Sequence, residues 1–304
     1  MTAAGFEASS PNKVLWPSTG FTKGQMLDYY ARAGPTLLPH LAGRPLTLGR
    51  FPEGVDRPGF AQTECRGRPA WVQTAAIRLR DGRVRNFCLA RDLRSLLWIA
   101  NLGTIELHTF LGADAGLERP AAVLFDIDPE PPCGLGDARR VALRLREWLA
   151  AREKTAIVKT SGGAGLHVLV PLNVPHTYAQ TREFAREGAH ELAHEHSDVV
   201  ASTSRRDRRA GTVLIDWAQN SERRTVVAPY SLRASDVPSV STPVSWEEVE
   251  RGEQLRFGPR EVLERIERFG DLFRPVLETM QRIGSQAPGA PGSPHPTPRV
   301  RHNR

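Results

Sequence analysis

Runs of apolar residues divide the second half of the chain into short strands. The intervening segments place apolar residues three and four positions apart, which predicts amphipathic helices at residues 137–151 and 181–195. The apolar runs predict strands at residues 123–128, 156–159, 167–172 and 212–216. This succession of strands and helices indicates a mixed α/β (α+β) core.

The first half of the chain has shorter and less regular elements. Residues 22–32 read as a helix capped by Thr22, and residues 92–101 read as a second helix. Strands are predicted at 46–51 and 103–110, and Asp81-Gly82 predicts the turn of a hairpin between residues 71–79 and 83–87.

The two ends of the chain differ in character from the middle. A further helix is predicted at residues 259–269, and the tail after it is rich in Pro, Gly and Ser. We therefore predict a flexible segment at 1–10, one main domain at 11–284, and a disordered tail at 285–304.

Composition indicates an ordinary globular protein. The chain has 304 residues, 40% of them hydrophobic and 25% charged, and no run approaches the roughly 20 apolar residues that cross a bilayer. The first residues lack the pattern of a signal peptide, so we expect a cytoplasmic protein with no membrane partner. Cys65, Cys88 and Cys133 are far apart and odd in number, so we expect buried small side chains rather than a disulfide or a zinc half-site.

The formal charge of +7 suggests a polyanionic partner. Of the 41 basic residues only four are lysines. An arginine-rich solvated surface without a partner remains the alternative interpretation.

Asp126 and Asp128 carry the strongest chemical signal. Residues i and i+2 of a strand project from one face, so these two carboxylates lie side by side and repel each other unless a cation lies between them. A divalent metal with oxygen ligands is the simplest explanation. Pro129 is expected to end the strand and to leave both carboxylates at an open edge.

Two further motifs extend this pair. Asp216 ends a predicted strand, and the glycine-rich loop from Ser161 to His167 joins two others. Three carboxylates can hold two divalent ions against a triphosphate, while loop N–H groups, the Ser161 hydroxyl and His167 contact phosphate oxygens. Arginines that could clamp the same anion follow at 223, 224 and 233. Each motif is weak alone, but together they indicate nucleotidyl transfer.

In order along the chain, these motifs resemble those of the archaeo-eukaryotic primase superfamily, and most closely the polymerase domain of bacterial ligase D. The matching segments are Phe-Asp-Ile-Asp-Pro at 125–129, Ser-Gly-Gly-Ala-Gly-Leu-His-Val at 161–168, Ile-Asp-Trp-Ala-Gln-Asn at 215–220 and Thr-Val-Val-Ala-Pro-Tyr-Ser-Leu-Arg at 225–233. The similarity runs from about Lys13 to about Arg274. It implies an RRM-like sheet that carries the metals and a second packed α/β subdomain.

The resemblance also assigns roles to single residues. It implies two Mn²⁺ or Mg²⁺ ions, and no zinc, at the catalytic carboxylates Asp126, Asp128 and Asp216. It implies nucleotide contacts at His108, Ser161, Gly162, Gly163, Gly165, His167, Gln219 and Arg233. It implies contacts to DNA at Lys13, Lys23, Phe60 and Arg209, with the two lysines on a 5′-phosphate and Phe60 stacked on the template.

The family pattern further implies a partner set. The expected substrates are 5′-phosphorylated DNA gaps or ends and nucleoside triphosphates, with ribonucleotides preferred, in gap filling or non-homologous end joining. Ku and a DNA ligase would come from other chains, at the bacterial nucleoid. Gly49, Ala61 and Ala164 replace residues that the family commonly uses for contacts, which predicts weaker binding with catalysis intact.

Two other interpretations stay open. His190-Glu191-Leu192-Ala193-His194 matches the zinc peptidase pattern H-E-x-x-H, although a solvent-exposed linking helix explains it as well. The missing basic residues are also compatible with a DNA-binding module that has lost catalysis.

Overall fold

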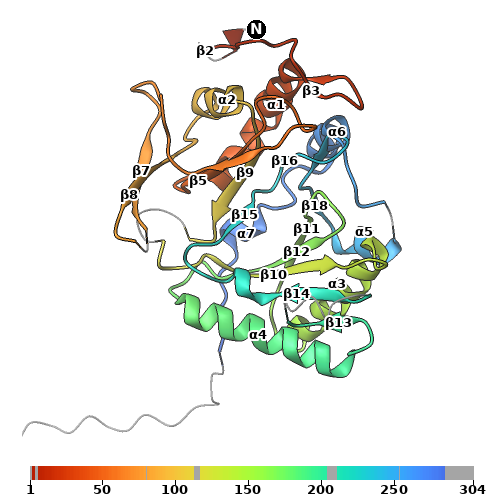
Figure 1. Cartoon of the computed structure of the whole chain (residues 1–304). Coiled ribbons are helices and arrows are strands. Elements are labelled where there is room, and N and C mark those ends of the chain that lie inside the picture. Colours follow the sequence, from red (N-terminus) through yellow and green to blue (C-terminus); the bar gives the residue numbers. More distant parts are fainter. Residues whose placement is uncertain are drawn as a thin grey trace, which may run out of the picture.

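The computed structural model describes residues 2–3, 6–79, 81–112, 117–203, 211–252 and 254–284. Two six-stranded sheets, which we name sheet I and sheet II, dominate it (Figure 1). Sheet I has the order β15-β9-β5-β8-β7, with β6 paired to β5, and sheet II has the order β13-β14-β10-β12-β11-β18. Seven helices are described around them. The mixed α/β fold class is therefore confirmed.

Sheet II contains the strands of the second half. Its members are β10 (Ala122–Pro129), β11 (Ile157–Thr160), β12 (Leu166–Pro171), β13 (Val200–Ala201), β14 (Val213–Asp216) and β18 (Pro243–Val244). All neighbours are antiparallel except β13 and β14. β10 lies inside the sheet, between β12 and β14, so both of its neighbours fix its register.

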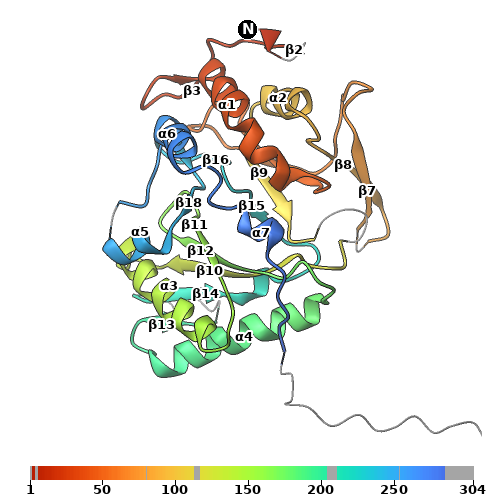
Figure 2. The ribbon, with the colours of Figure 1, turned by 180° about the vertical axis from the view of Figure 1, so that it is seen from behind.

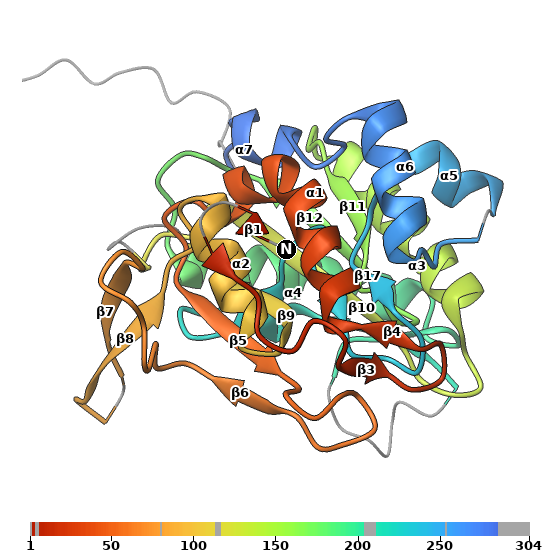
Figure 3. The ribbon, with the colours of Figure 1, turned by 90° about the horizontal axis from the view of Figure 1, so that it is seen from above.

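Sheet I is built mainly from the first half. Its strands are β5 (Leu46–Arg50), β6 (Phe60–Gln62), β7 (Thr74–Arg78), β8 (Val84–Cys88), β9 (Thr104–Phe110) and β15 (Thr225–Val227). The β7–β8 hairpin projects from the body of the molecule as an arm (Figures 1 and 3). β15 comes from the second half of the sequence, so sheet I also receives residues that follow the third carboxylate.

Helices cover the outer face of each sheet (Figures 1 and 2). α1 (Lys23–Leu41) and α2 (Leu93–Asn101) pack in one apolar cluster with β5 and β9. α3 (Leu135–Ala150) and α4 (Tyr178–Glu195) pack in another with alternate residues of β10, such as Phe125 and Ile127. Leu124, on the other face of β10, belongs to the first cluster. The face of sheet II that carries Asp126 and Asp128 therefore lies toward the first-half subdomain.

Short elements complete the described chain. β1 (Thr2–Ala3) pairs with β2 (Phe6–Glu7), and β3 (Val14–Trp16) pairs with β4 (Phe21–Thr22). β16 (Leu232–Arg233) pairs with β17 (Ser239–Val240). The remaining helices are η2 (Trp217–Gln219), α5 (Trp246–Arg251), α6 (Pro259–Phe269) and α7 (Pro275–Glu278). None of the helices in the described ranges is long and apolar enough to cross a bilayer.

Most predicted elements are present, and one was predicted too short. Thr22 caps α1 through the Gln25 backbone N–H, as expected, but the helix continues to Leu41 through Pro35 and Pro39. The apolar stripe continues through Leu37 and Leu41, which are buried. Burial of this stripe outweighs the local cost of the prolines. The domain bounds stay a prediction, although Ser9 lies at the end of the first segment and accepts a hydrogen bond from Lys23 Nζ at 2.9 Å.

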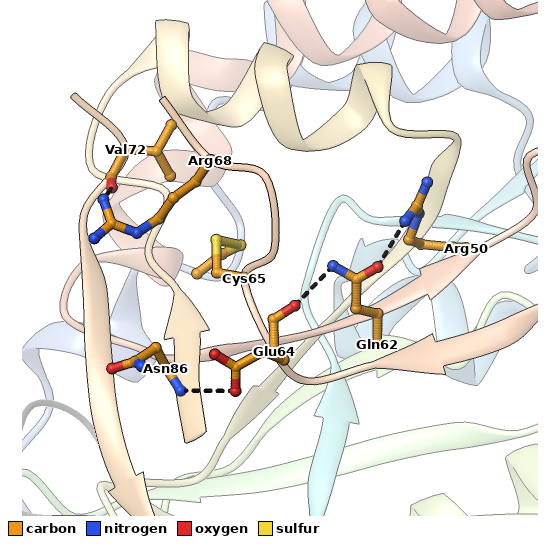
Figure 4. Close-up of a disulfide and its surroundings, with 8 residues drawn as sticks. Arg50, Gln62, Glu64, Cys65, Arg68, Val72 and Asn86 are labelled. Atoms are coloured by element: carbon orange, nitrogen blue, oxygen red, sulfur yellow. Dashed lines mark hydrogen bonds between the residues drawn. A yellow bond between two sulfur atoms is a disulfide. The ribbon is translucent and has the colours of Figure 1, made fainter. Parts of the chain in front are cut away.

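The expectation that the cysteines form no disulfide was wrong, although Cys65 and Cys88 are buried as predicted. Cys65 and Cys88 form a disulfide with their Cα atoms 5.0 Å apart, and of the three only Cys133 is free. Figure 4 shows that the bond joins the segment after β6 to the end of β8. The Cys65 N–H also donates to the Asn86 carbonyl at 2.7 Å. A separation of 23 residues along the chain hides this pairing from the sequence.

Candidate active site

Four polar side chains form a row across sheet II. Asp126 of β10 lies directly opposite Asp216 of β14 on one side and His167 of β12 on the other. His167 in turn lies opposite Lys159 of β11. Residues directly opposite in paired strands project from the same face. Strand register therefore brings these four residues together, although the first and the last are 90 positions apart in the sequence.

Asp126 and Asp128 both line the cleft beside this row. Since β10 is an inner strand, the carboxylates lie on a sheet face, and the predicted open edge was wrong. Asp126 Oδ1 is buried and accepts no hydrogen bond of good geometry, with His167 Nε2 3.2 Å from it. A buried carboxylate oxygen without such a bond is suited to a cation.

Asp216 faces a different set of partners. Its Oδ1 accepts the Ala218 backbone N–H at 2.9 Å, and its Oδ2 accepts Gln219 Nε2 at 3.2 Å, so the carboxylate caps η2. Burial, followed by the nearby Asp126, raises the pKa of Asp216 against the opposing effect of its hydrogen bonds. Asp126 and Asp216 are therefore close enough to repel, as a shared cation site requires.

Asn220 holds this segment against β10. The buried side chain accepts the Leu124 backbone N–H at 2.9 Å and donates to the Leu124 carbonyl at 2.6 Å. The side-chain amide thus pairs with the backbone of β10 as a neighbouring strand would. Sequence analysis assigned no role to Asn220, and its place at the end of the matching segment 215–220 was the available signal.

The glycine loop closes one end of the cleft. Ser161 Oγ accepts the backbone N–H groups of Gly163 and Gly165, both at 3.2 Å, which leaves its hydroxyl proton available for a phosphate oxygen. A Cβ on Gly165 would lie 2.6 Å from the Ile127 carbonyl oxygen. Gly162 has φ of +83°, and a Cβ there would lie 2.4 Å from Arg233 Cγ.

Sheet I and the segment after β15 supply the opposite wall. His108 Nε2 lies 2.8 Å from Glu106 Oε2, and Arg233 Nε lies 3.4 Å from Glu106 Oε1. Glu106 also accepts the Ala234 backbone N–H at 3.0 Å. Burial would raise the pKa of Glu106, but His108, Arg233 and the Ala234 N–H outweigh it and lower that pKa. Glu106 was not predicted as a site residue, although it fixes two residues that were.

These residues enclose a cleft of about 240 Å³ between the two sheets. Seven of the predicted metal- and nucleotide-binding residues line it: His108, Asp126, Asp128, Ser161, His167, Gln219 and Arg233. Of the three arginines proposed as clamps, Arg233 lines this cleft and Arg223 lines a separate hollow beneath the arm. The structure therefore gathers most of the predicted site in one place.

The cleft sets carboxylates against buried basic side chains. Burial would raise the pKa of Asp126, but His167, Lys159 and Arg233 outweigh it and lower that pKa. Burial, with Lys159 nearby, lowers the pKa of His167, and burial, with Arg233 nearby, lowers the pKa of Lys159 well below its ordinary value. Lys159 is another residue that the sequence interpretation did not assign to the site.

A second hollow, of about 320 Å³, adjoins the cleft. It shares His108 and Thr225 with the cleft and extends to Phe60, whose side chain is 49% exposed. The Arg50 guanidinium lies 5.3 Å from the centre of the Phe60 ring. Gly49 and Ala61, which depart from the family pattern, both line this hollow.

Lys13 and Lys23, the two lysines predicted to contact a 5′-phosphate, are neighbours through their backbones. The Lys23 N–H donates to the Lys13 carbonyl at 2.8 Å. Lys13 Nζ lies 2.8 Å from Glu53 Oε2. Burial, with Lys13 and Arg50 nearby, lowers the pKa of Lys23, which marks a concentration of positive charge suited to an anion. Arg209, the fourth predicted DNA contact, lies outside the described residues.

The carboxylates fit divalent ions only in part as they stand. Within the described ranges, no group of three or more His, Cys, Asp or Glu side chains is already arranged as a metal site. Asp126 and Asp128 supply hard oxygen ligands in the cleft, and Asp216 would join them once its oxygens turn from Ala218 and Gln219. The chemistry of these donors suits Mg²⁺ or Mn²⁺.

The H-E-x-x-H pattern lies on α4 and is used for packing. His190 and His194 are exposed, while Glu191 Oε2 accepts Trp148 Nε1 at 2.7 Å and lies 2.8 Å from Arg152 Nη2. A glutamate with these partners is not free to act as the base of a peptidase. The geometry favours the linking-helix interpretation.

Comparison with known proteins agrees with this geometry. Residues 22–273 match the family model of the LigD primase-polymerase domain. The chain is 34% identical over 276 residues to the multifunctional non-homologous end joining protein LigD of Mycolicibacterium smegmatis, covering 88% of this chain and 35% of that protein. It is 32% identical over 252 residues to the corresponding Pseudomonas aeruginosa protein, covering 81% of this chain and 29% of that protein.

A solved structure gives the same result for the fold. The polymerase domain of Mycobacterium tuberculosis ligase D in complex with DNA superposes with a TM-score of 0.85 at 33% identity, covering 91% of this chain and 99% of that one. The chain thus spans about a third of the M. smegmatis protein, but it covers nearly all of the M. tuberculosis polymerase domain.

Proposed function

Because the chain belongs to the LigD primase-polymerase family, we propose that it is a metal-dependent nucleotidyltransferase that extends a DNA primer 3′-end, with ribonucleotides preferred. The observation that carries this proposal is the row Asp216, Asp126 and His167 beside a cleft that also contains Asp128, Ser161 and Arg233. Carboxylates and phosphate-binding groups meet there on one sheet face.

The reaction would join the primer 3′-oxygen to the α-phosphorus of a nucleoside triphosphate. The bond from that phosphorus to the bridging oxygen breaks, pyrophosphate leaves, and the proton of the 3′-hydroxyl is released to solvent. Two divalent ions, when bound by Asp126, Asp128 and Asp216, would supply charge neutralisation and a more acidic hydroxyl.

The chain's own groups would bind and orient the triphosphate. The Ser161 hydroxyl lines the cleft and accepts two backbone N–H groups, so its proton is available to a phosphate oxygen. Arg233 offers guanidinium N–H groups, and Glu106 limits how far this side chain moves. His108 is fixed by Glu106 beside the same cleft.

The DNA would approach from the side of sheet I. The hollow that leads from the cleft to Phe60 gives a template base an aromatic surface on which to stack. Lys13 and Lys23 lie at this side, with Arg50 nearby, and the two lysines would bind the 5′-phosphate of a gap. The relatives named above act in non-homologous end joining, and we propose the same setting here, with Ku and a ligase activity supplied by other chains or segments.

Primer extension on gapped, 5′-phosphorylated DNA with Mn²⁺ and labelled ribonucleotides tests this function. We expect incorporation by the unaltered protein and its loss in Asp126→Ala and Asp216→Ala. Asp198→Ala, which removes an exposed carboxylate between α4 and β13, is the matched control and should retain full activity.

Two results would contradict the proposal. Incorporation that survives both substitutions would exclude these carboxylates as the site. DNA binding without any incorporation by the unaltered protein would favour the alternative, a binding module that has lost catalysis.

A further inference from the structure

Lys159 places an ionisable amine in the buried layer beneath the candidate site. Only 1% of the residue is exposed, and register places it opposite His167 on the face that carries Asp126. Its Nζ lies 2.9 Å from His167 Nδ1 and 2.6 Å from Ser241 Oγ. A buried lysine is costly unless its donors are used.

The hydrogen bond to Ser241 has a defined direction. Ser241 Oγ donates its single proton to the Thr160 carbonyl at 2.8 Å. A hydroxyl has one proton and two acceptor lone pairs. Ser241 must therefore accept from Lys159, and Lys159 Nζ acts as a donor in this bond.

The geometry around His167 gives the second bond the same direction. His167 Nε2 lies 3.2 Å from the buried Asp126 Oδ1. An unprotonated nitrogen would turn a lone pair toward a carboxylate oxygen and repel it, so the proton of a neutral imidazole belongs on Nε2. Nδ1 is then an acceptor, and Lys159 donates to it whether its amine is charged or neutral.

We propose that Lys159 is a positioning residue that holds His167 with its proton on Nε2, so that His167 presents an N–H donor to a phosphate oxygen of the nucleotide. The nucleotide contact rests on the proposed function, whereas the directed chain from Lys159 to His167 rests on the contacts alone. The glycine loop at 161–167 contains no lysine or arginine. The His167 Nε2–H therefore contributes a larger share of the phosphate binding at this loop.

Nitrogen NMR of histidine-labelled protein tests the chain without any nucleotide or metal. His167 is one of nine histidines and is assigned by the signal lost in His167→Gln. We expect Nε2 protonated and Nδ1 unprotonated in the unaltered protein and in Lys159→Arg, and a mixture of tautomers in Lys159→Met. Lys154→Met, outside the sheet, is the matched control and should change nothing at His167.

The unaltered protein alone can overturn the proposal. A His167 proton on Nδ1 would reverse the direction of the chain, even if Lys159→Met does not fold. A folded Lys159→Met with the tautomer of the unaltered protein would likewise exclude the role, because a purely structural lysine would affect melting but not the imidazole.

Kinetic measurements distinguish a Lys159 that acts on nucleotide binding through His167 from a Lys159 that acts independently of it. Loss of one donor that acts on phosphate binding should raise the KM for nucleotide about tenfold in Lys159→Met, with a smaller effect on kcat. Adding Lys159→Met to His167→Gln should cause little further loss, and additive losses would contradict the proposal. A protein that incorporates no nucleotide, yet shows the expected tautomers, would contradict the proposed function and leave the Lys159 chain intact.

Discussion

Sheet II and sheet I both contribute to the candidate site, but they hold their functional residues in different ways. In sheet II, strand pairing places the row Asp216, Asp126, His167 and Lys159. In sheet I, Phe60 depends on a short strand, on Arg50 and on the disulfide beyond it (Figure 4). Backbone register therefore sets the positions of the proposed reacting groups, whereas side-chain and covalent links set those on the proposed DNA side.

The difference predicts that damage to sheet II removes chemistry and leaves the fold. Asp126→Ala should lower incorporation by on the order of a thousandfold, since several kcal/mol of transition-state stabilisation depend on metal binding. Melting should fall only modestly, because the loss of the favourable contacts of Asp126 with His167 and Lys159 is partly offset by the loss of its repulsion with Asp216. Parallel primer-extension and thermal-melting measurements check both, and a large loss of melting temperature would mean that Asp126 is mainly structural.

Damage to the sheet I side should show the opposite pattern, in which stability falls more than incorporation does. Opening the bond in a Cys65→Ala, Cys88→Ala double variant releases a loop of 23 residues and should cost about 3 kcal/mol of stability. Hydrogen exchange should accelerate first in the segment from β6 to β8. Cys133→Ala is the control, and uniform acceleration across both sheets would contradict a local role.

The glycine loop offers a paired test within sheet II. Gly162→Ala places a Cβ 2.4 Å from Arg233 Cγ at a positive φ, so we expect about a tenfold rise in the KM for nucleotide, equivalent to about 1–2 kcal/mol. In Gly163→Ala the new Cβ meets only Ser161 Oγ at 3.6 Å, so little change is expected. Equal effects of the two changes would argue against Arg233 as the affected group.

Phe60→Ala should have the smallest effect. Loss of one stacked base should weaken binding of gapped DNA by about 1 kcal/mol, roughly fivefold, without regard to template sequence. The KM for nucleotide should change less, because Phe60 lies in the adjoining hollow. Fluorescence anisotropy with labelled DNA measures the effect, with the exposed Val237→Ala as control, and a strongly sequence-dependent loss would exclude stacking.

Local signals predicted much of the fold because they act over a few residues. Thr22 caps its helix as the sequence indicated, the helix predicted at residues 92–101 forms with Asp92 as its cap, and the Asp81-Gly82 turn forms where expected. The carboxylates and the glycine loop were identified because these residue types at this spacing indicate metal and phosphate binding as well as a strand and a loop. These elements carry their information in short segments.

The remaining features depend on contacts between distant segments. Lys159 became part of the site through its register with His167 and through Ser241, which lies 82 positions away. The Cys65–Cys88 bond and the clasp of Asn220 on β10 likewise need the tertiary structure. The predicted Arg209 contact falls outside the described residues, so it stays a prediction.

The inner position of β10 has a consequence for how this protein can vary in length. Inserting or deleting one residue in β10 would turn Asp126 and Asp128 toward α3 and α4 and bring Phe125 and Ile127 to the cleft. The same change would bury two carboxylates in an apolar core, so folding would fail together with catalysis. Length changes should be tolerated instead at the tip of the β7–β8 arm, where Asp81, Gly82 and Arg83 are exposed.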